Sequence, residues 1–193
     1  MGLMVVAAAR EELGDLPGEV VGVGPIVAAV RATMLLEQRK PSRVVLVGTA
    51  GSYAGGPPVG SAVAASRVGW SYGVAALGLG YVPRPPAPLD GDPEMLAELG
   101  LPSHPVLTVG AVTTDLALAQ RLSDGWAVEH LEAFGVALAC REAQVPFVAV
   151  LGISNEVGRD AHVQWLTHRD EAQEAARLAI APLLGRRAPA RTP

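Results

Sequence analysis

The fold of this chain is decided by residues Trp126–Gly158, which read W-A-V-E-H-L-E-A-F-G-V-A-L-A-C-R-E-A-Q-V-P-F-V-A-V-L-G-I-S-N-E-V-G. The pattern predicts a helix of small residues over Leu131–Ala143, with Glu132 near its start. A buried-type strand is predicted over Phe147–Ile153, and Asn155 follows just past its end. A fold could bring an acid at a helix start and an amide at a strand end to one cleft. This pairing exceeds what a scaffold needs, so an enzyme is the working hypothesis for the chain.

Upstream of this stretch, strand-like and helix-like segments alternate. Apolar runs of strand length predict strands over Leu3–Ala9, Glu19–Val23 and Arg43–Val47. Pro25 suits the first turn of a helix, apolar residues then recur at helical spacing, and Pro41 ends the helix. Two strand–helix units in succession predict a sheet with helices on its faces.

The remaining elements are predicted on the same grounds. Three further strands are expected, over residues 61–68, 106–112 and 126–128. Asp115 is a candidate cap for a short helix over Leu116–Leu122. A helix over Asp170–Leu184 closes the chain, with Leu178 among its inward-facing residues. The proline-rich segment Val82–Pro93 is predicted to be a loop.

The composition fits one layered α/β domain. The chain has 193 residues, of which 50% are hydrophobic and 4% aromatic, so small aliphatic residues are expected to fill the core. We predict a single domain over residues 1–185 and a flexible tail over residues 186–193, where arginines gather beside prolines. The net charge of −4 argues against a nucleic-acid partner.

The single cysteine, Cys140, lies on the apolar side of a predicted helix and is interpreted as a buried, inert thiol. Because one cysteine cannot form a disulfide within the chain, a reducing cytoplasm fits. No apolar run reaches the roughly 18 residues of a membrane span, so no membrane partner is expected. Leu3–Ala9 lacks a preceding basic segment and is followed at once by charged residues. It is therefore interpreted as a first strand and not as a signal peptide.

Small-residue and acidic motifs in the first part of the chain have both structural and functional interpretations. Gly22–Gly24 lacks the third glycine of a dinucleotide site and is interpreted as a strand-to-helix turn. The segment Gly48–Ser52 suits a structural turn and a ligand loop about equally well. On spacing alone, Glu11 and Glu12 fit solvated charges at a helix start better than a catalytic carboxylate.

Ionisable residues also gather in the second half of the chain. A spacing of three puts Glu129 and Glu132 on one side of a helix start, where either can serve simply as a cap. Asn155 can likewise cap the segment that follows it. The four histidines lack the spacing of a zinc site, so we predict no metal and no cofactor. These histidines are His104, His130, His162 and His168.

Six segments, in order along nearly the whole chain, resemble the nucleoside phosphorylase/nucleosidase superfamily. They are Ala7–Leu13, Gly22–Ala29, Lys40–Gly51, Val59–Ser66, Leu131–Ala133 and Val145–Asn155. Within that superfamily the chain is similar to the methylthioadenosine/adenosylhomocysteine nucleosidases and still more to the futalosine hydrolases of menaquinone synthesis. The second likeness rests on Ile153–Asp160 followed by Trp165, with a spacing one residue shorter. Residues 129–132 read Glu-His-Leu-Glu where those enzymes usually have Glu-Asn-Met-Glu.

The resemblance implies a three-layer α/β/α sandwich with a mixed central sheet, a nucleoside phosphorylase-like fold that usually assembles as homodimers or larger oligomers. It implies that Glu12 holds the attacking water as general base, and that Glu132 accepts hydrogen bonds from the ribose 2′ and 3′ hydroxyls. Other residues are expected to line the nucleoside: Thr49, Ala50, Gly51 and Leu131. Asn155 would meet the base. The implied activity is hydrolysis of the N-ribosidic bond of a purine nucleoside.

Two departures from the family pattern narrow this activity. Asn155 stands where adenine-specific nucleosidases carry an Asp. Because an amide can donate to a 6-oxopurine but cannot pass on a proton, the predicted substrate is futalosine, which releases hypoxanthine. Leu46 stands where phosphorylases carry a phosphate-binding arginine, so water is the favoured nucleophile, with Arg10 and Arg43 as remaining anion contacts. The alternatives are a methylthioadenosine/adenosylhomocysteine nucleosidase, a purine nucleoside phosphorylase and a catalytically silent nucleoside-binding homologue.

Overall fold

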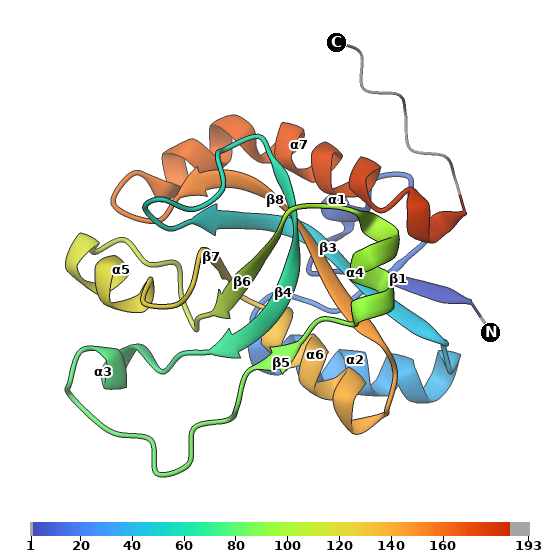
Figure 1. The fold of residues 1–193 in the computed structure, drawn as a ribbon, viewed down its shortest axis with the longest axis horizontal. Helices are drawn as coiled ribbons and strands as arrows, with labels where there is room; N and C mark the ends of the chain where they lie inside the picture. The colour runs from blue at the N-terminus through green and yellow to red at the C-terminus, as the bar shows by residue number, and fades with distance from the viewer. Residues whose placement is uncertain (1, 186–193) are drawn as a thin grey trace.

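The computed structural model describes residues 2–185, so the predicted tail over 186–193 lies outside the described residues. Within the described range, eight strands form one sheet (Figure 1). The strands are β1 (Leu3–Ala7), β2 (Glu19–Val20), β3 (Arg43–Ser52), β4 (Ala62–Trp70), β5 (Leu89–Asp90), β6 (Ser103–Thr108), β7 (Val128–His130) and β8 (Phe147–Glu156). Their hydrogen-bonded order is β2-β1-β3-β7-β6-β4-β5, and β8 pairs with both β3 and β4. The strands β3, β7, β6, β4 and β8 therefore close a ring of pairings within the sheet.

The sheet is mixed, as expected. β3 runs parallel to β1 and β8, and β6 runs parallel to β4 and β7. The pairs β3–β7, β4–β8 and β4–β5 are antiparallel. The long β3–β8 pair forms the centre of the molecule, where the C-terminal ends of both strands lie side by side.

Helices cover both faces of the sheet, and the predicted three-layer sandwich is confirmed. They are α1 (Arg10–Leu13), α2 (Pro25–Arg39), α3 (Gly73–Ala76), α4 (Pro93–Leu99), α5 (Leu116–Leu122), α6 (Ala133–Glu142), α7 (Ala161–Ala179) and the 3-10 helix η1 (Pro182–Leu184). Figure 1 shows α7 along one face and α2 with α6 against the opposite face. No helix among residues 2–185 has the length and apolarity needed to cross a bilayer.

The central strand β3 divides its side chains between two cores, because successive residues of a strand point to opposite faces. Val44 and Leu46 pack in the core that α2 and α6 cover. Val45 and Val47 pack in a second core, together with Ile180 at the end of α7. Both faces of β3 are buried, which explains why its sequence is a continuous apolar run and does not alternate.

The two central strands extend beyond their predicted ends. β3 continues to Ser52 and β8 to Glu156, because the strands stay paired up to these two residues. The prediction that Gly48–Ser52 is a loop is therefore wrong. Asn155 lies within β8 and does not cap a following segment, so that interpretation is also wrong.

Three boundaries near the site differ from the prediction. β6 covers Ser103–Thr108 and not 106–112, since residues 110–112 are exposed beyond the sheet. β7 covers Val128–His130, and α6 begins only at Ala133. Glu129 is therefore a strand residue, and the prediction that it shares one side of a helix start with Glu132 is wrong.

Boundaries in the outer helices are partly as predicted. The Asp115 cap is confirmed, since its Oδ1 accepts a hydrogen bond from Leu118 N over 2.8 Å. The last long helix begins at Ala161, well before the predicted Asp170. Leu178 is 49% exposed, contrary to the prediction. It follows the buried Ala176 by two residues, which places its side chain on the opposite face of the helix. α4 begins at Pro93, the last residue of the predicted loop, and was not predicted.

Candidate active site

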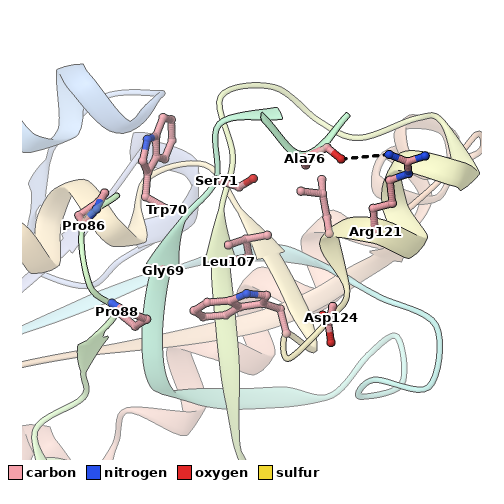
Figure 2. Close-up of a pocket in the computed structure, with 11 residues that line it drawn as sticks. Gly69, Trp70, Ser71, Ala76, Pro86, Pro88, Leu107, Arg121 and Asp124 are labelled. Carbon is pink, nitrogen blue, oxygen red and sulfur yellow. Dashed lines mark hydrogen bonds between the residues drawn. The ribbon is translucent and has the colours of Figure 1, made fainter. Parts of the chain in front are cut away.

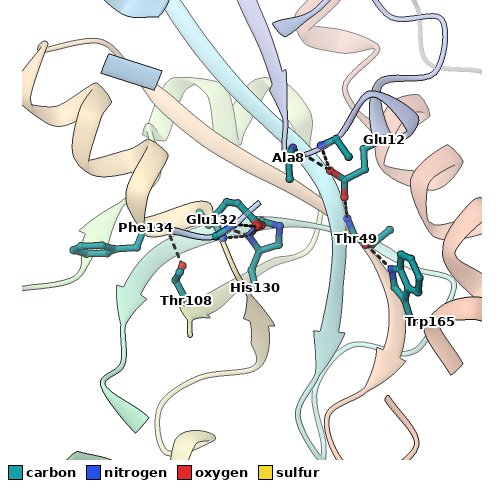
Figure 3. A network of polar contacts seen from close by, with 11 residues as sticks. Ala8, Glu12, Thr49, Thr108, His130, Glu132, Phe134 and Trp165 are labelled. Carbon is teal, nitrogen blue, oxygen red and sulfur yellow. Dashed lines mark hydrogen bonds and ion pairs between the residues drawn. The ribbon is translucent and has the colours of Figure 1, made fainter. Parts of the chain in front are cut away.

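Glu12 is held at the junction of β1 and α1 by three backbone donors (Figure 3). Its Oε2 accepts hydrogen bonds from Ala8 N (3.0 Å) and Ala9 N (3.2 Å), and its Oε1 accepts one from Thr49 N (3.1 Å). Burial raises the pKa of this carboxyl above its usual range, and His130 and the backbone donors offset part of that rise. Glu11 is exposed, so the solvated interpretation fits Glu11 and not Glu12.

The N-terminus of α6 forms the second part of the site. His130 Nδ1 accepts hydrogen bonds from Glu132 N and Ala133 N, each over 3.1 Å. Thr108 Oγ1 accepts a third hydrogen bond, from Phe134 N over 2.9 Å. Side chains from β6 and β7 thus satisfy the first free N–H groups of this helix.

Glu132 joins the starts of two helices. Its Oε1 accepts a hydrogen bond from Gly24 N over 2.8 Å, at the N-cap of α2. The predicted Gly22–Gly24 turn therefore binds a side chain of the same protein. The carboxyl is 4% exposed, and burial raises its pKa to about 7. Burial also lowers the pKa of the neighbouring His130 to about 4, so this imidazole is neutral near neutral pH.

Glu129 has a different role from Glu132. Its Oε2 accepts a hydrogen bond from Tyr53 OH (2.8 Å), and its Oε1 accepts one from Thr113 N (2.9 Å). These contacts tie β7 to the end of β3 and to the loop after β6. Leu131, a predicted nucleoside contact, is half-buried and packs with the apolar cluster that contains Tyr53. Glu129 is thus a structural anchor.

Asn155 lies beside Gly51 in the β3–β8 pair. Its Oδ1 accepts a hydrogen bond from Ser154 Oγ (2.9 Å), and its Nδ2 donates one to the carbonyl oxygen of Glu156 (3.0 Å). A Cβ on Gly51 would lie 2.9 Å from Asn155 Nδ2, so a glycine is needed for the amide to lie here. Among residues 2–185, the second N–H of this amide has no acceptor, and it can donate to a ligand.

Gly48 marks the point where the carboxylate and imidazole groups converge. A Cβ at this position would lie 3.0 Å from Glu12 Oε1 and 3.4 Å from His130 Nε2. Thr49, next in β3, binds Glu12 through its backbone and Trp165 through its hydroxyl. The structure therefore brings Glu12, Thr49 and Glu132 around the C-terminal half of β3, with Ala50 buried and Gly51 and Asn155 further along the same strand pair.

Comparison with known proteins identifies the family. The sequence matches the profile described as "Phosphorylase superfamily" over residues 16–184. The chain belongs to the phosphorylase superfamily. A 5′-methylthioadenosine/S-adenosylhomocysteine nucleosidase of Bacillus thuringiensis (strain Al Hakam) is 29% identical over 189 residues, which cover 86% of this chain and 81% of that protein.

Solved structures share the fold of this phosphorylase-superfamily member. A methylthioadenosine/adenosylhomocysteine nucleosidase of Colwellia psychrerythraea in complex with adenine has a TM-score of 0.83 at 18% identity, covering 96% of this chain and 95% of the other. A futalosine hydrolase mutant of Helicobacter pylori has a TM-score of 0.84 at 13% identity, covering 96% and 99% of the two chains. Both resemblances confirm the expected fold, and their low identity limits the conclusion to the fold.

Other candidate features of the superfamily member lie outside this cluster. A cavity of about 280 Å³ is bounded by Trp70, Pro86 and Trp126 (Figure 2), and its lining contains none of the predicted site residues. Cys140 is buried in the core, and burial raises the pKa of its thiol to about 12. Among residues 2–185, no three His, Cys, Asp or Glu side chains are grouped so that they could hold a metal ion.

His130, Thr108 and Trp165 have no role predicted from the sequence. His130 and Thr108 are strand residues that accept hydrogen bonds from the first N–H groups of α6. Neither has the spacing of an ordinary helix cap, so the local sequence does not indicate this role. Trp165 was noted only as part of a motif. A signal for His130 did exist, since it replaces the Asn of the similar motif next to a predicted site acid.

Proposed function

We propose that this protein hydrolyses the N-ribosidic bond of purine nucleosides. The observation that carries the proposal is the pair of carboxylates, Glu12 and Glu132, which lie near the two different nitrogens of one imidazole. Glu12 lies with His130 Nε2 around Gly48, and Glu132 Oε2 lies 3.4 Å from His130 Nδ1. The sequence relatives named as nucleosidases support the same reaction class.

The two carboxylates suit two different tasks in this reaction. As the C1′–N9 bond breaks, positive charge develops on the ribose and the electron pair leaves with the purine. Glu132 would accept hydrogen bonds from the 2′ and 3′ hydroxyls, and these bonds strengthen as the sugar becomes cationic. Glu12 would take a proton from the water whose oxygen bonds to C1′. Thr49 would also contact the nucleoside, and Leu131 is carried over as a further contact.

Hydrolysis is favoured over phosphorolysis by the residues of β3. Leu46, in the position of the phosphorylase arginine, is fully buried in the core and offers no charge. Arg43 Nη1 lies 2.6 Å from Glu98 Oε2, at the start of β3 and away from Gly48. The earlier expectation that Arg43 contacts an anion in the site is therefore not supported. A phosphate dianion would lack a guanidinium fork on this strand.

A 6-oxopurine base, as in futalosine, is our finer proposal. The Asn155 side chain has its oxygen engaged by Ser154 and an N–H able to donate, which suits O6 or N7 of a base such as hypoxanthine. A second candidate is an adenine nucleoside, because the relatives with 29% identity are named methylthioadenosine/adenosylhomocysteine nucleosidases. With no carboxyl at residue 155, an adenine leaving group would have to take its proton from solvent.

The test is release of free base from futalosine, inosine and methylthioadenosine by the purified protein, with and without phosphate. We expect release from the 6-oxopurine nucleosides, with a rate independent of phosphate. Glu12→Gln and Glu132→Gln should each reduce kcat/KM by about 100-fold or more, as expected for groups used in the transition state. Base release that persists in both variants, or none from any nucleoside, would contradict the proposal.

Base preference is tested by Asn155→Asp. A carboxyl can donate to N7 when protonated and accept from a 6-amino group when ionised, so this variant should shift preference from inosine toward adenosine-type substrates. The measurement is the ratio of kcat/KM for the two substrates in each protein. An unchanged ratio would mean that Asn155 does not contact the base.

Self-association through α2 is the partner that we propose. The outward face of this helix, and Val23 two residues before it, carry exposed apolar side chains: Val23 (64% exposed), Ile26 (78%), Val27 (44%), Val30 (57%) and Met34 (55%). A patch of this kind, beside the Gly24 that binds Glu132, suits a second copy of the chain. Light scattering should give a dimer or larger for the wild type and a smaller species for Val30→Asp. A cytoplasmic location remains a prediction.

A further inference from the structure

The imidazole of His130 has a fixed tautomer. Its Nδ1 accepts hydrogen bonds from two backbone N–H groups, those of Glu132 and Ala133, each over 3.1 Å. A ring nitrogen that accepts cannot carry a proton, so the proton of the neutral imidazole lies on Nε2. The side chain is 3% exposed. The start of α6 therefore decides which nitrogen is the donor.

The donor nitrogen and Glu12 both lie beside Gly48. A Cβ placed on Gly48 would lie 3.4 Å from His130 Nε2 and 3.0 Å from Glu12 Oε1. The two atoms thus border the same small space, which exists because residue 48 has no side chain. The Glu12 carboxylate already accepts hydrogen bonds from three backbone N–H groups. His130 Nε2 borders the space beside its Oε1 at Gly48.

We propose that His130 is a positioning residue that uses its Nε2–H to keep the Glu12 carboxylate ionised and oriented toward the nucleoside. The proposal deepens the proposed function, because it gives Glu12 the role of general base. His130 touches neither the water nor the sugar in this account. It acts through Glu12, and α6 acts through His130 by fixing the tautomer.

The imidazole of His130 has opposite effects on the ionisation of the two carboxyl groups. The ionisable groups that face it are Glu12 from α1 and Glu132 from the start of α6. The Nε2–H edge favours charge on Glu12, whereas the lone pair of Nδ1 lies 3.4 Å from Glu132 Oε2 and disfavours charge there. A ribose diol would supply Glu132 with the donors that His130 does not. One neutral imidazole thus leaves one carboxylate ready to act as a base and the other ready to bind hydroxyls.

Two variants distinguish the role of Nε2 as a donor from the role of Nδ1 as an acceptor. In His130→Asn the side-chain oxygen takes the place of Nδ1, so the hydrogen bonds from Glu132 N and Ala133 N are kept and the Nε2 donor is lost. In His130→Gln the amide NH2 takes the place of Nε2, so the donor is kept and the acceptor for α6 is lost. Because Asn also keeps an acceptor beside Glu132, a change in its pH profile reports on Glu12.

We expect His130→Asn to keep a Tm close to that of the wild type and to move the acidic limb of kcat/KM upward by about one pH unit, a tenfold loss on that limb. Its KM should change little. His130→Gln should lower Tm and leave the acidic limb in place. A wild-type pH profile in His130→Asn, or equal upward shifts in both variants, would overturn the proposal. Gly48→Ala, which inserts a methyl group between the two residues, should shift the limb in the same direction as His130→Asn.

A readout that needs no activity keeps this inference distinct from the proposed function. Nitrogen-15 NMR of the histidine-labelled protein should show, for the signal lost in His130→Asn, a protonated Nε2 and an unprotonated Nδ1 from pH 5 to pH 8. Glu12→Gln should lower the pKa of that imidazole further, since the ring loses its facing carboxylate. A protonated Nδ1, or an imidazole unaffected by Glu12→Gln, would overturn the inference even in an active enzyme. The expected spectra in a protein that cleaves no nucleoside would instead leave the geometry intact and reject the proposed function.

Discussion

Trp165 Nε1 donates a hydrogen bond to Thr49 Oγ1 over 3.2 Å, which joins α7 to the C-terminal half of β3 (Figure 3). The indole is held from both sides, since His162 stacks on it with centroids 5.9 Å apart and the Arg169 guanidinium lies 5.1 Å from its centroid. Because Oγ1 acts as the acceptor for the indole, its own proton is free to donate to a ligand. Under the proposed function, this contact would set the direction in which the Thr49 hydroxyl donates to the nucleoside.

Trp165→Phe is the first prediction that follows. Phenylalanine keeps an aromatic ring between His162 and Arg169 but has no N–H, so the Thr49 hydroxyl loses its orientation. We expect kcat/KM to fall about fivefold, the equivalent of one hydrogen bond of about 1 kcal/mol, with Tm nearly unchanged. Trp126→Phe, at the separate cavity, is the matched control and should leave kcat/KM as it is. Equal kinetic effects of the two variants would contradict this role for Trp165.

The buried Glu132 makes stability depend on pH. Its folded-state pKa of about 7 lies above the ordinary 4.5, so the folded state binds the proton more tightly than the unfolded chain. The stabilisation is complete below about pH 4.5 and is lost as the pH rises through 7. Glu132→Gln should therefore be more stable than the wild type at pH 8, by up to about 3 kcal/mol, and nearly equal to it at pH 5. Urea denaturation at the two pH values measures this difference.

Glu129→Gln is the control for that experiment. The two Glu129 oxygens accept from Tyr53 OH and Thr113 N, and a glutamine offers only one oxygen to these two donors. This variant should be less stable than the wild type at both pH values. Part of the pH dependence should persist in Glu132→Gln, since burial also raises the pKa of Glu12. A Glu132→Gln protein that is less stable than the wild type at pH 8 would refute the linkage argument.

Much of the fold could be predicted because its causes are local. The apolar runs of β1 and β3 and the proline-bounded α2 have patterns that one strand or one helix determines alone. The ends of β3 and β8 could not be predicted, because their last residues are small or polar. These residues form strands only because β3 and β8 pair with each other. Ser52 pairs with Glu156, more than a hundred residues away in the chain. Such non-local pairing leaves no periodic signal in either segment.

The candidate site could be predicted in its acids and amide but not in the groups that hold them. Glu12, Glu132 and Asn155 were named through resemblance, and the structure shows each one buried or half-buried with fixed partners. Their supports are backbone N–H groups and His130, and a backbone donor has no sequence signature. The roles of Glu129 and Glu132 differ because a strand and a helix start present side chains in different directions.

Close packing of α7 on the sheet gives a third prediction. A Cβ on Gly152 would lie 1.8 Å from the carbonyl oxygen of Ala172, so α7 would have to move away from β8. Gly152→Ala should lower the free energy of unfolding by about 3 kcal/mol or more, as expected for overpacking against backbone. Gly73→Ala, where an added Cβ meets nothing within 4 Å, should change it by less than about 0.5 kcal/mol. Similar stabilities of the two variants would show that α7 is not held this closely.

Gly51→Ala tests the base side of the site. An added Cβ would lie 2.9 Å from both Asn155 Nδ2 and Val157 Cγ2, so the amide would be displaced from its place over β3. If Asn155 reads the base, kcat/KM for a 6-oxopurine nucleoside should fall about tenfold or more, because a misplaced donor loses its hydrogen bond in the transition state. Substrates with a 6-amino group should lose less, so the preference between inosine and adenosine should narrow. Gly80→Ala, which adds a methyl group in open space, controls for the substitution itself. A Gly51→Ala enzyme that keeps the wild-type preference at a lower rate would separate Asn155 from base recognition and leave Glu12 and Glu132 as the supported part of the site.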